Sequence, residues 1–270
     1  MKMVVGKQFE QQVPVDDIRC VRDICTLAVR SREICAAARP GQFVMVKASG
    51  ERCDDPLLRR PFSVHRISGD ILTIIFKIIG RGTDHLSRMT NAGTVDVLGP
   101  LGNGFRLSEK AKVHYLVGGG MGVAPLQFLA ETIRGEMAGA HVVALVGART
   151  ASESDNFRAI CDVPDIEVKI ATDDGSAGHH GFVTELLAAD IDKKKEMQVY
   201  CCGPHVMMHK VAQLCRCHGV NCQVSLESHM ACGIGACLGC AVSGAGAAKE
   251  KKYLHVCKEG PVFEAEQIWA

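Results

Sequence analysis

The chain has 270 residues, a length that predicts two or three compact domains. Its residues are 47% hydrophobic and 23% charged, as in an ordinary soluble protein. Its 31 basic and 30 acidic residues leave a net charge of +1, which argues against a nucleic-acid partner. The apolar runs are too short to cross a membrane and we expect no signal peptide, so a cytoplasmic location is predicted. In that reducing compartment the fourteen cysteines are not expected to form disulfides.

The first part of the chain predicts an antiparallel β-structure. Short runs of β-forming residues separated by turns occur at residues 42–47, 62–67, 71–79 and 94–98. Strands at this spacing are typical of a barrel or a sandwich. We therefore expect a β-barrel domain over residues 1–108.

The motif Arg60-Pro61-Phe62-Ser63 in this domain is a candidate cofactor site. An arginine can pair with a phosphate, an aromatic ring can cover a flavin or adenine face, and a hydroxyl can bond a flavin edge. Further candidates are Lys77 and the loop Gly80-Arg81-Gly82-Thr83. Taken alone, these residues fit a charged loop with a packed phenylalanine better than a cofactor site.

A βαβ pattern begins near residue 112. Buried runs alternate with helix-compatible segments, at residues 113–117, 141–146, 166–171 and 197–202. This rhythm is typical of a parallel sheet. We expect an α/β nucleotide-binding domain over residues 109–222.

A glycine loop, Gly118-Gly119-Gly120-Met121-Gly122, lies between the first of these strands and a helix predicted over 124–137. Glycines let the backbone approach a phosphate, and a helix N-terminus supplies free N–H groups. Val123 stands at the sixth position of the Rossmann fingerprint and no acidic residue follows at the usual distance, so a Rossmann dehydrogenase is disfavoured. A tight structural turn is the alternative.

Other strand ends carry further candidates, because ligands of open α/β sheets bind beyond the carboxyl ends of the strands. Cys202 and Gly203 follow the strand 197–202, where a nicotinamide can stack, and Cys202 is the candidate catalytic residue. Arg149 follows the strand 141–146, where a base can meet a 2′-phosphate. Asp173 follows the next strand and favours an unphosphorylated ribose.

The most specific pattern is Cys232, Cys237 and Cys240 followed by Cys257, with the spacing C-x4-C-x2-C-x16-C. Its first three positions match the plant-type [2Fe–2S] ligand loop. Zinc ligands usually come as two short-spaced pairs, so a structural zinc site is the less favoured alternative. The pattern predicts a small iron–sulfur domain over residues 223–270.

These motifs, in this order, resemble the ferredoxin–NADP reductase superfamily and, more closely, its dihydroorotate dehydrogenase B electron-transfer subunits. The resemblance covers nearly the whole chain. It implies that Arg60 contacts the pyrophosphate of FAD and that Phe62 and Ser63 lie at the flavin ring. It also implies that the loop 80–83 contacts the flavin and that the loop 118–125 contacts NAD.

The resemblance further implies the electron path. A partner subunit containing FMN would oxidise dihydroorotate, a [2Fe–2S] cluster would relay single electrons, and FAD would pass a hydride to NAD, in a hetero-tetramer of pyrimidine biosynthesis. Two alternatives stay open. One is the small flavin subunit of an NAD(P)H:ferredoxin or sulfur-reducing complex, and the other is a zinc-bearing dinucleotide sensor.

Overall fold

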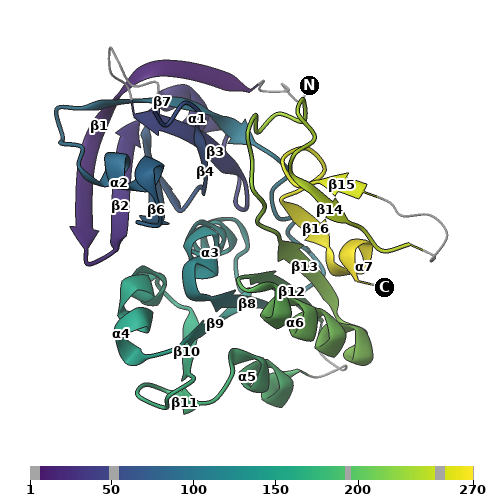
Figure 1. Ribbon diagram of the computed structural model, residues 1–270. Coiled ribbons are helices and arrows are strands. Elements are labelled where there is room, and N and C mark those ends of the chain that lie inside the picture. Colours follow the sequence, from purple (N-terminus) through teal and green to yellow (C-terminus); the bar gives the residue numbers. More distant parts are fainter. Residues whose placement is uncertain (1–6, 49–54, 192–195, 247–252, 270) are drawn as a thin grey trace.

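The computed structural model describes residues 7–48, 55–191, 196–246 and 253–269, and Figure 1 shows their arrangement. The N-terminal part forms a seven-stranded antiparallel sheet in the order β4-β3-β7-β1-β2-β6-β5. Its strands are β1 (Gln8–Val21), β2 (Ile24–Arg30), β3 (Phe43–Ala48), β4 (Arg60–Ser63), β5 (Arg66–Ser68), β6 (Ile71–Lys77) and β7 (Thr94–Leu101). The sheet curls into a half-barrel accompanied by two short helices, α1 (Arg32–Ala37) and α2 (Arg81–Ser87) (Figure 1). The predicted antiparallel β-structure is confirmed.

The longest strand, β1, was not predicted. Its first half pairs with β7 and its second half with β2, so it connects the two halves of the sheet. Val13 and Val15 are buried, but charged residues such as Asp16 and Asp17 interrupt the apolar pattern. Short apolar runs therefore identify the inner strands and miss this one.

A disulfide joins Cys20 and Cys25, which corrects the expectation that the cysteines form none. The turn between β1 and β2 pairs Val21 with Ile24 and thereby places Cys20 opposite Cys25. The register of this hairpin depends on the geometry of the turn. It could not be predicted from the composition or from the expected compartment.

The second sheet has the strand order β11-β10-β9-β8-β12-β13-β16 and is parallel except at β16. Its strands are β8 (Val113–Gly119), β9 (His141–Ala148), β10 (Glu167–Thr172), β11 (His179–His180), β12 (Met197–Cys202), β13 (Asn221–Ser225) and β16 (Val262–Glu264). The helices between them are α3 (Ala124–Glu136), α4 (Ala151–Ser154), α5 (Val183–Asp190) and α6 (His205–His218), with 3-10 turns at Gly120–Val123 and Asp155–Asp162. The predicted parallel sheet and the helix after the glycine loop are confirmed.

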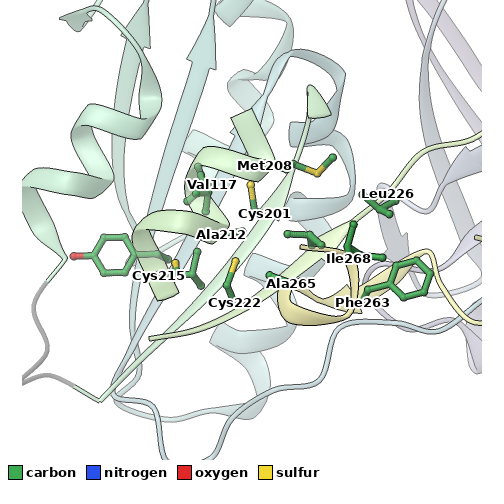
Figure 2. Close-up of a cluster of buried hydrophobic side chains, with 14 of the residues drawn as sticks. Val117, Cys201, Met208, Ala212, Cys215, Cys222, Leu226, Phe263, Ala265 and Ile268 are labelled. Carbon is green, nitrogen blue, oxygen red and sulfur yellow. The ribbon is translucent and has the colours of Figure 1, made fainter. Parts of the chain in front are cut away.

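Side chains that alternate along the strands supply the two faces of this sheet. Leu116 and Ala144 pack under α3 on one face, whereas Val117 and Cys201 pack under α5 and α6 on the other. Figure 2 shows the core on the face covered by α5 and α6, in which side chains of α6, β12 and β13 meet those of Phe263 and Ile268 near the C-terminus. Helices therefore cover both faces, as parallel strands require.

The C-terminal segment leaves the sheet after β13 and returns to it as β16, which pairs antiparallel with β13. Between them a small hairpin forms from β14 (Ala241–Ser243) and β15 (Tyr253–His255), and α7 (Ala265–Ile268) follows β16. The predicted domain boundary between residues 222 and 223 falls inside β13. Within the described residues, none of the helices combines the length and apolar character that a membrane span requires.

Candidate functional site

The residues of the Arg60-Pro61-Phe62-Ser63 motif form β4, and the side chain of Arg60 packs against Gly82 in the first turn of α2. A Cβ built on Gly82 would lie 2.8 Å from the Arg60 Nε atom. The hydroxyl oxygen of Thr83 accepts from the Gly80 N–H at 3.2 Å, which holds the loop in shape. The structure thus brings the two predicted flavin motifs into contact, although they are separated in the sequence.

A cavity of about 220 Å³ opens between the two sheets and is called here the inter-sheet cavity. It is lined by residues of both predicted flavin motifs, of the glycine loop and of the segment after β13: Pro61, Phe62, Ser63, Lys77, Thr83, Met121, Ala124, Glu227 and Met230 among others. The ring centroid of Phe62 lies 5.4 Å from that of Phe76, and the Lys77 ammonium lies 3.0 Å from a carboxylate oxygen of Asp23. The cavity therefore has an aromatic wall and, at its edge, a lysine that is paired with a carboxylate, which suits a planar ring with polar edges.

The glycine loop and the loop after β12 pack backbone against backbone. A Cβ built on Gly122 would lie 2.3 Å from the carbonyl oxygen of Cys202, and one on Gly119 would lie 2.6 Å from the sulfur of Met207. Gly203 has a φ of +151°, which favours glycine. The glycines therefore allow two strand-end loops to meet at one point beside the inter-sheet cavity.

This contact predicts a strong effect for Gly122→Ala. The added methyl group must displace the backbone at Cys202, and such overpacking costs about 1–3 kcal/mol. Gly135→Ala is the matched control, because its Cβ meets nothing within 4 Å and alanine favours a helix by about 0.5–1 kcal/mol. Urea denaturation of both variants measures the free energy of unfolding. A Gly122→Ala variant as stable as the unaltered chain would contradict the close approach.

The side chain of Cys202, the candidate catalytic residue, is only 1% exposed. Burial raises the pKa of its thiol well above the usual range, so the thiol stays protonated at neutral pH. It is the backbone at Cys202 and Gly203 that approaches the glycine loop. Any role of Cys202 in the reaction would therefore be exerted by a neutral thiol or by its backbone.

A second cavity, of about 350 Å³, lies beyond the carboxyl ends of β8, β9 and β10 and is called here the strand-end cavity. Arg149, Glu153, Asp173 and Lys210 are the charged residues that line it, and Gly119 and Gly120 form its inner wall. Asp173 therefore lies on a cavity wall beside the glycine loop, as the strand-end rule predicts. Gly118 lies behind this wall and is buried in β8.

The sequence did not single out Glu227, which lies where the inter-sheet cavity meets a third cavity of about 750 Å³. Its side chain is exposed along the cavity walls, yet the surrounding protein partly desolvates the carboxylate and raises its pKa. Trp269 lines the same third cavity and packs edge-on against His205, with ring centroids 5.0 Å apart. Glu227 follows the carboxyl end of β13, so the strand-end rule that indicated Gly203 could also have indicated it.

The four predicted metal ligands lie in two pairs, at the β14–β15 hairpin and on the loop before it. Cys240 precedes β14 and Cys257 follows β15, and the pairing of these strands brings the two sulfur atoms within 3.2 Å of each other. Cys232 and Cys237 lie on the preceding loop, where the Cys237 N–H points at the Cys232 sulfur at 3.4 Å. Gly233, with a φ of +71°, packs this loop against Met45 of β3.

Backbone N–H groups surround these sulfur atoms. Burial opposes the thiolate of Cys232, but the N–H groups of Ile234 and Cys237 outweigh that cost and lower the pKa of the thiol to about 6. Burial and the neighbouring Cys240 raise the pKa of Cys257 to about 12. In the described part of the chain no three ligand side chains meet at one point, and the four cysteines form two pairs. Two pairs with N–H donors to sulfur fit two irons that share four thiolates.

Comparisons with known proteins agree with this layout. Residues 116–213 match the family model of the oxidoreductase NAD-binding domain, and residues 227–269 match that of the iron-sulfur cluster binding domain of dihydroorotate dehydrogenase B. The electron transfer subunit of dihydroorotate dehydrogenase B (NAD(+)) from Desulforamulus reducens is 40% identical over 244 residues, covering 87% of this chain and 88% of its own. The subunit of the same name from Clostridium perfringens is 34% identical, and the match covers 94% of this chain and 95% of that subunit.

Solved structures share the fold. An NADH-dependent reduced ferredoxin–NADP oxidoreductase superposes with a TM-score of 0.80 at 28% identity, covering 95% of this chain and 89% of its own. A ferredoxin NADP+ reductase from Neisseria gonorrhoeae, solved with FAD and NADP, has a TM-score of 0.61 at 18% identity. The match covers 79% of this chain and 92% of the reductase.

A curled antiparallel sheet, a parallel sheet with a glycine loop at its carboxyl edge and a cysteine-rich C-terminal segment define an oxidoreductase of the ferredoxin–NADP reductase class. Together with the matched domains they support FAD, a [2Fe–2S] cluster and NAD as its cofactors. Within that class the chain belongs to the family of dihydroorotate dehydrogenase B (NAD+) electron transfer subunits. The family name implies a catalytic partner subunit in a complex.

Proposed function

We propose that this chain carries electrons from dihydroorotate, oxidised on the FMN of a catalytic partner subunit, to NAD, in a cytoplasmic hetero-tetramer that serves pyrimidine biosynthesis. When bound, the cluster supplies one-electron transfer, and FAD exchanges one or two electrons and transfers a hydride to the nicotinamide. The observation that carries the proposal is the inter-sheet cavity, which residues of both flavin motifs, Met121 of the glycine loop and the segment after β13 line together. That segment ends at Met230, two residues before Cys232, so the cluster loop follows directly in the chain.

FAD would be held by the half-barrel. The Arg60 guanidinium supports this assignment because it can make two parallel hydrogen bonds to a pyrophosphate. Phe62, Ser63 and Thr83 line the inter-sheet cavity and would contact the flavin ring, and Lys77 would lie at its polar edge. Gly80 and Gly82 would let the start of α2 approach the cofactor closely.

NAD would bind across the carboxyl edge of the parallel sheet. Gly119 and Gly120 line the strand-end cavity and would allow the pyrophosphate to approach the backbone. Gly118 and Gly122 would permit the tight turn, and Gly203 lines the neighbouring cavity where the nicotinamide would stack.

The partner subunit would dock beside the cluster loop. Cys237 is exposed, and the large apolar side chains of Ile234 and Leu238 beside it are 43% and 57% exposed. Exposed apolar side chains around a metal ligand suit a protein partner, which would shorten the electron path to the cluster.

Reconstitution tests the proposed function. The chain, purified with the catalytic subunit under anaerobic conditions, is expected to form NADH from dihydroorotate and NAD, with FAD assigned to this chain and FMN to the partner. A chain that holds no FAD, or a complex that reduces ferredoxin with NADH but does not use dihydroorotate, would overturn the proposal. The second outcome would favour the ferredoxin-reductase alternative.

Asp173 predicts a preference for NADH over NADPH, because a carboxylate accepts a hydrogen bond from a ribose 2′-hydroxyl and repels a 2′-phosphate. Asp173→Asn is expected to raise KM for NADH about tenfold, the size of a charged hydrogen bond, with little change in kcat. Steady-state kinetics of the purified chain with an artificial acceptor measures both constants. A higher kcat/KM for NADPH than for NADH in the unaltered chain would contradict the assignment.

A further inference from the structure

A charge pair closes one side of the strand-end cavity. Arg149 is the first residue after β9, and Glu153 lies on the short helix α4. One oxygen of the Glu153 carboxylate accepts from the Arg149 backbone N–H at 2.8 Å and lies 3.3 Å from the Nε atom of the same residue. The Glu153 side chain is 26% exposed, against 75% for Arg149, so the carboxylate is the better fixed partner.

Neighbouring loops hold this carboxylate in place. The Thr150 hydroxyl accepts from the Glu153 N–H at 3.2 Å and caps α4. The Ala151 N–H donates to the Ser176 hydroxyl at 2.7 Å, which ties α4 to the loop after β10. Four hydrogen bonds therefore set the position of Glu153 relative to Arg149 and to that loop.

The charges around the strand-end cavity balance. Arg149 and Lys210 contribute two positive charges, and Glu153 and Asp173 contribute two negative ones. The Lys210 ammonium lies 5.8 Å from the ring centroid of Phe182, so an aromatic face already attracts it. Of the two cations that line this cavity, Arg149 is therefore the one next to α4, and Glu153 neutralises it.

We propose that Glu153 is a specificity-determining residue that makes this cavity select NAD over NADP by holding Arg149 and by repelling a 2′-phosphate. The inference rests on the proposed function, in which the cavity binds the adenosine half of the dinucleotide. NADP differs from NAD by one phosphate of about −1.5 to −2 charge. To bind that phosphate, Arg149 would have to leave Glu153, and the phosphate would lie next to two carboxylates. A 2′-hydroxyl requires neither change.

Two small probes isolate this effect from catalysis. The compounds 5′-AMP and 2′,5′-ADP differ only in the 2′-phosphate, and isothermal titration calorimetry with the full chain and its cofactors gives both dissociation constants. The unaltered chain is expected to bind 5′-AMP more tightly. Glu153→Gln keeps an acceptor for the Arg149 N–H but removes the charge, and it is expected to shift the affinity ratio about tenfold toward 2′,5′-ADP.

Two further variants identify the cause. Adding Arg149→Ala to Glu153→Gln is expected to cancel the gain, because the released guanidinium is the group that binds the phosphate. Asp165→Asn is the matched control, since it removes another carboxylate that pairs with an arginine, at 3.2 Å from Arg134, outside the cavity. Its affinity ratio is expected to stay unchanged.

The outcomes separate the two proposals. An unchanged ratio in Glu153→Gln with normal 5′-AMP binding would overturn the role of Glu153 alone. An equal shift in Asp165→Asn would also overturn it, because the effect would then reflect net charge. A gain that survives Arg149→Ala would show that Arg149 is not the phosphate ligand. Failure of both compounds to bind the unaltered chain would overturn the nucleotide site and with it the proposed function.

Discussion

Replacing Cys237 by serine is expected to remove the cluster and most dihydroorotate-to-NAD activity, while FAD stays bound. The physical reason is that Cys237 is one of the four predicted cluster ligands of the C-terminal segment, whereas the predicted flavin residues lie on the half-barrel. Changes outside the ligand shell of a metal site already cost about 10- to 100-fold, so loss of a ligand is expected to lower coupled activity by about 100-fold or more. The visible spectrum measures the cluster, and NADH formation with the partner measures coupling.

A diaphorase assay separates the cluster from the flavin in the same variant. Transfer from NADH to a small soluble acceptor at the flavin is expected to persist, because that reaction does not require the cluster. Cys217→Ser is the matched control, since Cys217 is also an exposed cysteine, located on α6 away from the cluster loop. It is expected to keep the cluster, FAD and coupled activity.

Loss of a thiolate can also unfold a segment held by a metal. Far-UV circular dichroism and the FAD content show whether the rest of the chain is intact. Full coupled activity in an intact variant without the cluster would mean that electrons pass directly between the two flavins. The relay role of the cluster would then be wrong.

Arg60→Ala is expected to release FAD. The guanidinium lies on Gly82 and would make a bidentate, charge-assisted contact to the pyrophosphate. Two such hydrogen bonds correspond to a loss of about 100-fold or more in FAD affinity. Arg60→Lys is expected to recover only part of this loss, because an ammonium keeps the charge but lacks the planar fork. The FAD content after dialysis, measured by absorbance, reports the result.

Arg66→Ala provides the control for a lost arginine in the same sheet. Arg66 lies on β5, is 57% exposed and pairs with Glu131 of α3 at 3.0 Å. We expect this variant to retain its FAD. Full FAD in dialysed Arg60→Ala would contradict the assignment of the pyrophosphate contact.

Several parts of the fold are readable from local patterns. The strands 113–117 and 197–202 are buried apolar runs, and the helix after the glycine loop begins with alanine and proline, as helix starts often do. The antiparallel part was predicted from short runs bounded by turns, but the charged β1 was missed. Strong, short-range periodicity therefore identifies the inner elements, because burial on a regular backbone imposes that period.

The chemistry of the candidate site is also largely carried by sequence. The spacing of Cys232, Cys237, Cys240 and Cys257 predicts a cluster site, and the β14–β15 pairing places Cys257 next to Cys240. The glycines of the loop 118–122 predict a close approach of the backbone to a phosphate. The structure shows that Gly122 also packs against the backbone at Cys202.

Local sequence patterns therefore predict the inner strands and propose residue types suited to each cofactor. The Cys20–Cys25 disulfide, the burial of Cys202 and the pairing of Arg149 with Glu153 are visible only in the folded chain. The same holds for the return of β16 to the parallel sheet and for the bounds of β13, inside which the predicted boundary falls. Periodicity and ligand spacing depend on interactions within one segment of the chain, so they can be recognised in the sequence. Register, burial and charge pairing depend on how segments distant in the sequence pack against one another.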